Sequence, residues 1–331
     1  MIGRPKSKVK RKPLSTTIKI ELLEKMKNIS EEKKIPLNRL MESAMEEWLK
    51  KDGKGKKIKE WKEICDGANK LKNPSIKHEI FLELTKYIEF YDSVESSIWS
   101  HITAGVDKFN INSDFLLSMK GTIMSIRLSL EHGNINDAYS LLRKYQDISV
   151  MHIYSILYLE NNFSIDNITV KKINDWVKEE KQSPNYNKMI KYIANSEKTK
   201  KITNVIREKN NTDLRQRFND HTHFNFYSYL SLNNSAKDNF NNNKTTFLNQ
   251  FSNDINIIYV SHFIWLFTIK EYYMTASDYV DYLDIGEEPP ENSQYWVSPF
   301  IQEMFNEVIK KTQPSLSTEF KKGIEFMELK E

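Results

Sequence analysis

Residues 13–20 read Pro-Leu-Ser-Thr-Thr-Ile-Lys-Ile, a stretch rich in β-branched residues. Because successive side chains of a strand point to opposite faces, Ile18 and Ile20 share one face. The stretch therefore predicts a short β-strand with one apolar face and one polar face. The polar face carries Ser15, Thr17 and Lys19.

Two helical patterns follow this strand. Leu22, Met26 and Ile29 recur at helical spacing, and residues 33–36, which end in a proline, terminate that first helix. A second amphipathic helix follows, with Asn38 as its predicted N-cap. Its apolar stripe contains Leu40, Met41, Ala44, Met45, Trp48 and Leu49.

One strand and two short helices cannot bury their own apolar faces. A lone strand also leaves both of its edges unpaired. Two copies that pair their strands as a ribbon and interlock their helices would solve both problems. The segment therefore predicts a homodimer.

Residues 14–51 resemble the ribbon-helix-helix family of Arc-like and MetJ-like repressors. The resemblance rests on STTIKIELLEKMK (15–27) and IPLNRLMESAMEEWL (35–49). It implies a two-stranded ribbon in the major groove, where base edges distinguish all four base pairs. A dimerisation module without a DNA role is the alternative. The implied base-contacting residues are Ser15, Thr17 and Lys19, and the implied phosphate-binding amides are those of Asn38 and Arg39.

Charge is unevenly distributed along the 331 residues. Residues 1–60 hold 18 Lys and Arg against 9 Asp and Glu, a net charge of +9; the remainder holds 31 against 36, a net charge of −5. A basic segment ahead of an acidic body is typical of a polyanion-binding head, with a solvated tail as the alternative. In the basic arm, residues 1–12, we expect contacts to DNA phosphates or a minor groove. The arm residues concerned are Arg4, Lys6, Lys8, Lys10, Arg11 and Lys12.

Composition excludes several protein classes. With 39% hydrophobic and 28% charged residues the chain can fold, and its length favours about two domains. The single cysteine, Cys65, excludes an internal disulfide and a multi-cysteine metal site. Nine glycines and nine prolines are few for this length, which favours an α-rich fold.

The sequence carries no signal-peptide pattern at its start. Its best membrane-span candidate, residues 255–269, falls short of the roughly 20 apolar residues of a span and includes Asn256 and His262. We therefore expect a buried helix there, no membrane partner and a cytoplasmic location.

The predicted fold is mainly α: a ribbon-helix-helix domain at residues 13–52, a linker at 53–75 and an all-α body at 76–331. The Asn-rich residues 233–246 and the turn at 286–290 are predicted loops. Helices of the body are expected at about 76–106, 113–131, 136–160, 169–181, 185–209, 212–223, 245–275 and 297–310.

Within the body, Asn136 is a predicted N-cap of a helix that carries Arg143 and Asp147. The two charges lie four residues apart on one face. This spacing predicts a structural ion pair, worth a few tenths of a kcal/mol if exposed. Facing inward, the two side chains would instead form part of a site.

Residues 214–225, LRQRFNDHTHFN, form a dense polar cluster. Histidine transfers protons near neutral pH, and arginine holds a phosphate or a developing negative charge. These groups would suffice to cleave RNA through its 2′-hydroxyl without a metal. The same groups would also make a buried hydrogen-bond network between helices, and the chemistry alone favours that network.

Two further kinds of site are disfavoured. A metal site at Asp220, His221 and His223 lacks a His-Glu-x-x-His run and a cysteine partner. The sequence also has no Gly-rich phosphate loop and no Gly-x-Ser-x-Gly turn, so nucleotide and serine hydrolysis are disfavoured. We expect no cofactor.

Residues 75–275 resemble, in helical plan, the HEPN-type proteins of bacterial defence and toxin–antitoxin systems. The resemblance rests on Leu141-Leu142-Arg143 and on an Arg-x(4–6)-His pattern. It implies an endoribonuclease with Arg217 and His223 at the scissile phosphate and Arg143 assisting. The alternative pair is Arg215 with His221. Many such domains are inactive scaffolds.

The sequence therefore predicts a homodimeric or higher oligomeric protein that binds double-stranded DNA, as a transcriptional, plasmid or mobile-element regulator. The helical body would serve oligomerisation, sensing or an effector role. The alternative is a metal-independent ribonuclease with a DNA-binding head, which adds RNA as a partner.

Overall fold

The computed structural model describes residues 24–29, 37, 78–209, 214–233 and 241–330. The chain divides into two compact units, residues 1–72 and 73–331. In the first unit, residues 24–29 are helical. The rest of the expected ribbon-helix-helix domain and the linker, apart from Leu37, lie outside the described residues.

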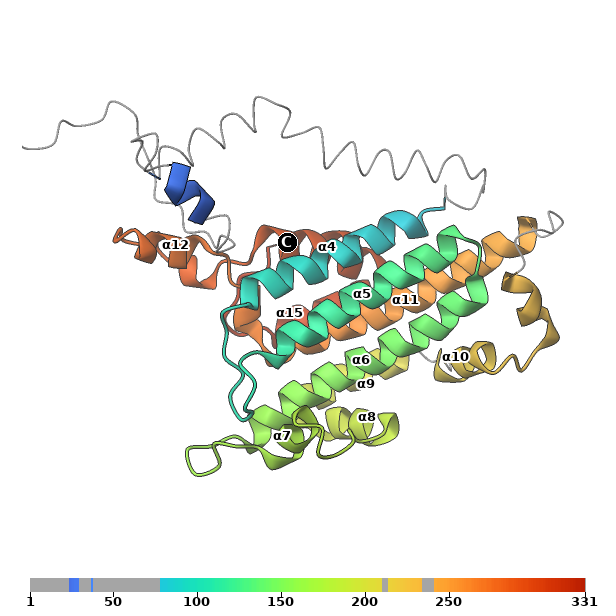
Figure 1. The fold of residues 1–331 in the computed structure, drawn as a ribbon, viewed down its shortest axis with the longest axis horizontal. Helices are drawn as coiled ribbons and strands as arrows, with labels where there is room; N and C mark the ends of the chain where they lie inside the picture. Colours follow the sequence, from blue (N-terminus) through green and yellow to red (C-terminus); the bar gives the residue numbers. More distant parts are fainter. Residues whose placement is uncertain (1–23, 30–36, 38–77, 210–213, 234–240, 331) are drawn as a thin grey trace, which may run out of the picture. The chain divides into compact units, whose positions relative to one another are not determined.

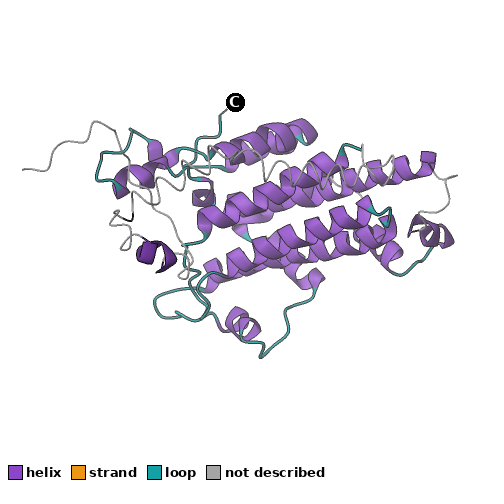
Figure 2. Cartoon of the chain, turned by 45° about the horizontal axis from the view of Figure 1, so that its top comes forward, coloured by secondary structure: helices purple, strands orange, loops and turns teal. Residues whose placement is uncertain are grey.

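Among its described residues the second unit is mainly helical (Figure 2), and its only β-contacts there are isolated bridges. The expectation of a mainly α body is confirmed for these residues. The helices are α4 (Ile80–Ile98), α5 (Ile111–Glu131), α6 (Ile135–Asn162), α7 (Lys171–Val177), α8 (Tyr186–Asn195), α9 (Glu197–Lys209), α10 (Leu214–Thr222), α11 (Asn241–Ile269), α12 (Asp278–Asp284), α13 (Pro299–Met304), α14 (Lys310–Thr312) and α15 (Pro314–Gly323).

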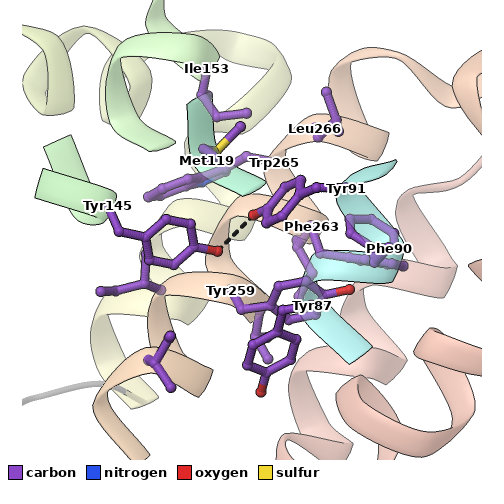
Figure 3. Close-up of a cluster of buried hydrophobic side chains, with 14 of the residues drawn as sticks. Tyr87, Phe90, Tyr91, Met119, Tyr145, Ile153, Tyr259, Phe263, Trp265 and Leu266 are labelled. Carbon is purple, nitrogen blue, oxygen red and sulfur yellow. Dashed lines mark hydrogen bonds between the residues drawn. The ribbon is translucent and has the colours of Figure 1, made fainter. Parts of the chain in front are cut away.

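Four long helices, α4, α5, α6 and α11, lie alongside one another and form the bundle of this unit (Figure 1). Large aromatic side chains fill its centre. Tyr87 of α4 stacks on Tyr259 of α11 with ring centroids 4.1 Å apart, and Phe90 packs edge-on against the same Tyr259 (Figure 3). Burial of such rings is the main apolar contribution to the core.

Residues 255–269 lie in α11, and the prediction of a buried helix there is confirmed. Ile255, Phe263, Leu266 and Phe267 are fully buried in the bundle. No helix among the described residues is long and apolar enough to cross a membrane.

Shorter helices surround the bundle. Helix α10 packs on α6, α8 packs on α6 and α9, and α15 packs on α9 and α11. Between α13 and α14, residues Phe305–Ile309 form one π-helical turn. Helix α10 and the residues directly after it carry the polar cluster that the sequence singled out.

Several helices differ from the sequence prediction. The helix expected at 76–106 ends at Ile98, because Asn110 donates from Nδ2 to the Ile98 carbonyl (2.8 Å) and caps α5 with its side-chain oxygen. The helix expected at 185–209 divides at Ser196, whose backbone is extended. Helix α15, which the sequence analysis missed, begins with Pro314, a residue favoured in a first turn.

Candidate functional site

Helix α10 positions the polar cluster through one apolar face. Leu214, Phe218 and His221, at spacings of four and three, are its buried residues, and they turn toward α6. In this orientation Arg215 and Arg217 lie on the flanks of the helix and are half-buried. His223 lies just beyond the end of the helix and is exposed. The cluster is therefore divided between interior and surface.

Arg217 is held by a buried carboxylate on α11. Its Nε donates to Oδ2 of Asp254 at 2.9 Å, and its second guanidinium nitrogen donates to Oδ1 at 3.2 Å. Gln250 donates to the same Oδ1 at 2.8 Å. Burial raises the pKa of Asp254, and the Arg217 charge opposes that rise. Three donated hydrogen bonds thus compensate a carboxylate that has no exposure to solvent.

His221 lies between two tyrosine rings. Its ring centroid is 3.8 Å from that of Tyr139 and 3.9 Å from that of Tyr229, and both pairs are stacked nearly parallel. Nδ1 donates to Oδ1 of Asn136 at 2.8 Å, while the Asn136 amide donates to the His221 carbonyl at 3.1 Å. The Asn136 side-chain nitrogen is used as a donor, so the atom that faces His221 is the oxygen, which can only accept. His221 therefore carries a proton on Nδ1.

Burial and, to a smaller extent, the nearby Arg217 charge lower the pKa of His221 to about 4, although the Asp220 charge opposes the shift. The imidazole is therefore neutral near pH 7. A histidine with this pKa is a poor proton donor at neutral pH, because almost none of it carries the second proton. The alternative catalytic pair thus contains a histidine whose contacts are those of a structural residue.

Arg215, the other member of that pair, bonds to Asp147 of α6 and lies over the Tyr186 ring at 4.4 Å. The prediction of an ion pair between Arg143 and Asp147 is wrong, because the structure shows no ion pair between these two described residues. Helix α10 brings Arg215 to the Asp147 carboxylate, and Asp147 pairs with that arginine instead.

The prediction that Asn136 is the N-cap of α6 is also wrong. The N-cap of α6 is Asn134, and Asn136 is buried inside the first turn of the helix. Its side chain binds His221, as described above, and its backbone N–H donates to the Asn233 side chain at 3.0 Å. An asparagine near a predicted helix start can either cap that helix or bind a residue of another helix. Here the packing of α10 against α6 selects the second role.

The structure does not join Arg217 to His223. The His223 side chain is exposed, and its backbone N–H donates to the Asn219 carbonyl at 2.9 Å. Arg143 lies half-buried on α6. Among the described residues, no hydrogen bond or ion pair links the side chains of these three implied catalytic residues.

No group of three or more metal-ligating side chains occurs among the residues that the structure describes. All implied DNA-contacting residues lie outside that part of the chain. These are Arg4, Lys6, Lys8, Lys10, Arg11, Lys12, Ser15, Thr17, Lys19, Asn38 and Arg39.

Sequence reasoning missed Asp254, Tyr139 and Tyr229, which complete the cluster from three other segments. Asp254 did carry a signal. It is the one carboxylate directly ahead of the apolar residues 255–269, and an acid in such a stretch needs a buried partner. Tyr139 and Tyr229 have no comparable signal, because aromatic residues are common in the helices of this chain.

No protein-family model, no curated protein and no solved structure matches this chain.

Proposed function

We propose that this protein is a homodimeric, sequence-specific DNA-binding protein whose N-terminal ribbon-helix-helix unit reads a short palindromic site. The observation that carries the proposal is the pattern of residues 13–51, preceded by an arm with six basic residues. A ribbon paired across two copies fits the major groove. The net charge of +9 on residues 1–60 supplies attraction for phosphate.

The contacts in the helical body support the same proposal. Arg215, Arg217 and His221 each hold a partner on α6 or α11, so they fasten α10 to the bundle. In this proposal the body is a scaffold that adds oligomerisation or sensing to the DNA-binding head.

Two variants of the full chain test the proposal. The site is first selected from a pool of random duplexes, and affinity is then measured by fluorescence anisotropy. Changing Thr17→Ala and Lys19→Ala together should weaken binding to the selected site by about 1–3 kcal/mol per lost base contact. Binding to unrelated duplex should change much less; equal weakening on both would remove these residues from the readout.

Deletion of residues 1–12 is the second variant. It should flatten the dependence of affinity on salt, because fewer counterions are released. The full chain should also sediment as a dimer or larger oligomer. A monomer that binds DNA with an unchanged salt slope would contradict the ribbon and assign the arm to a solvated tail.

A metal-independent ribonuclease is the second candidate, and the exposed side chain of His223 favours it. This histidine lies two residues beyond the buried His221 and is accessible to a substrate. Wild type and His223→Ala should be incubated with defined single-stranded RNA in chelator. Cleavage by wild type alone would make the body an effector enzyme, and no cleavage by either would leave it a scaffold or sensor.

A further inference from the structure

A hollow of about 420 Å³ lies between the start of α5, the middle of α6 and the end of α7, away from the polar cluster on α10. Its volume falls within the range of small-molecule sites. Its lining combines apolar side chains with three charged groups. The lining residues are Lys108, Ile111, Asp114, Phe115, Ser118, Ile148, Met151, Trp176, Val177 and Glu179.

Two aromatic rings form a wall of this hollow. Phe115 of α5 and Trp176 of α7 stack with ring centroids 5.8 Å apart and planes 22° apart. Trp176 keeps part of its surface exposed. Because Phe115 is buried and already stacks on both His152 and Trp176, a flat ligand ring would stack on the exposed part of Trp176, where it would remove apolar surface from water.

A polar atom without a partner lies one ring behind the wall. His152 has no exposure to solvent and stacks on Phe115 with centroids 4.9 Å apart. Its Nδ1 bonds to Nε2 of His262 at 3.0 Å, but its own Nε2 has no hydrogen-bond partner. Most buried polar atoms in proteins are paired, and this nitrogen is one of several in the described residues that are not.

The rim of the hollow carries a net negative charge. Lys108 and Asp114 pair with each other, so their charges cancel. The exposed Glu179 has no ion pair with any described residue. Its backbone adopts φ +61° at the end of α7, where its N–H donates to the Trp176 carbonyl at 3.0 Å.

That left-handed position is normally filled by glycine or asparagine, because a larger side chain costs about 1–3 kcal/mol there. Strain of this kind persists mostly at functional sites. Here it places a free carboxylate at the edge of an aromatic wall. Glutamate thus supplies a charge at this rim that glycine would not.

We propose that this hollow binds a small planar aromatic molecule that carries a positively charged amino group. The ring stacks on the exposed part of Trp176, and the Glu179 carboxylate at the rim attracts the cation. This site is separate from the DNA-binding proposal, and its test has its own readout.

The test uses three indoles that share a ring and differ in charge: tryptamine, neutral indole and indole-3-acetate. Their affinity for the full chain is measured by saturation-transfer NMR. Tryptamine should bind tightest and indole-3-acetate weakest, with about a tenfold difference between them from the cation interactions. Glu179→Gln should remove most of that difference and leave indole unchanged.

Ser118→Trp should block all three probes, because Ser118 lies exposed on the lining and a large ring there fills the hollow. Met124→Trp is the matched control, since it also lies exposed on α5 but outside the lining. Equal affinity for the three probes, or binding that survives Ser118→Trp, would overturn the proposal. If Ser118→Trp does not fold, the Glu179→Gln comparison still decides the outcome.

Discussion

Arg217 and Asp254, 37 residues apart in sequence, form a two-point ion pair that ties α10 to the bundle. The Asp254 side chain is fully buried, whereas Arg217 keeps 28% of its side-chain surface. A planar guanidinium on a planar carboxylate fixes orientation as well as distance. The pair therefore sets the rotation of α10 and with it the place of His221.

Loss of this pair should destabilise the fold. Arg217→Ala should lower the free energy of unfolding by about 2–4 kcal/mol, because it leaves a buried carboxylate without its cation. The double variant Arg217→Met with Asp254→Leu removes both charges and should cost less than Arg217→Ala alone. Urea unfolding measures all three proteins. A loss below about 1 kcal/mol for Arg217→Ala would mean that water compensates Asp254.

His221 should make stability depend on pH. Its pKa is about 4 in the folded protein and about 6.5 in the unfolded chain, so between these values the unfolded state holds more protons. The stabilising term is complete above pH 6.5 and falls as the pH drops toward 4, by about 3 kcal/mol at most.

His221→Gln should flatten the pH dependence in that window, as measured by the urea midpoint from pH 7.5 to 4.5. His152 and His262 titrate in the same direction, because burial lowers the pKa of both, so the wild-type slope belongs to all three. Only the difference between the two proteins reports on His221. His132→Gln, at an exposed position, is the control, and an equal flattening there would refute the assignment to His221.

Two tyrosines in the core should differ in importance despite a shared hydrogen bond. The hydroxyls of Tyr91 and Tyr145 lie 2.7 Å apart (Figure 3). Tyr91 also bonds to Nδ1 of His262 at 3.1 Å. Tyr145→Phe breaks one bond and should cost about 1 kcal/mol. Tyr91→Phe leaves two buried groups unpaired and should cost about 2–3 kcal/mol. Urea unfolding checks the order, and the reverse order would contradict this network.

Two glycines should respond in opposite ways to alanine. Gly105 has φ +91°, and a Cβ there would lie 3.0 Å from side-chain atoms of both Leu159 and Val170. Gly105→Ala should therefore destabilise by about 1–3 kcal/mol. Gly121, in the middle of α5, has open space around its Cα, so Gly121→Ala should stabilise by about 0.5–1 kcal/mol. Thermal melts of both variants test this contrast.

Much of the secondary structure of the body could be predicted from local sequence patterns. The spacing of apolar residues predicted α5, α6 and α10 within a few residues of their observed bounds, and the polar interruptions marked 255–269 as a buried helix. Helices α12 and α15 were missed because they are short and carry weak patterns. The division at Ser196 was missed because an extended residue leaves no mark in helical periodicity.

The sequence by itself determined that the body is helical and that α10 concentrates arginines and histidines, since both follow from residue type and spacing within one segment. Only the tertiary structure decided what those side chains do. Asp147 accepts Arg215 rather than Arg143, and Asn136 binds His221 instead of capping α6. The physical reason is that the partners of a buried charge come from other helices, and their approach depends on how the whole core packs.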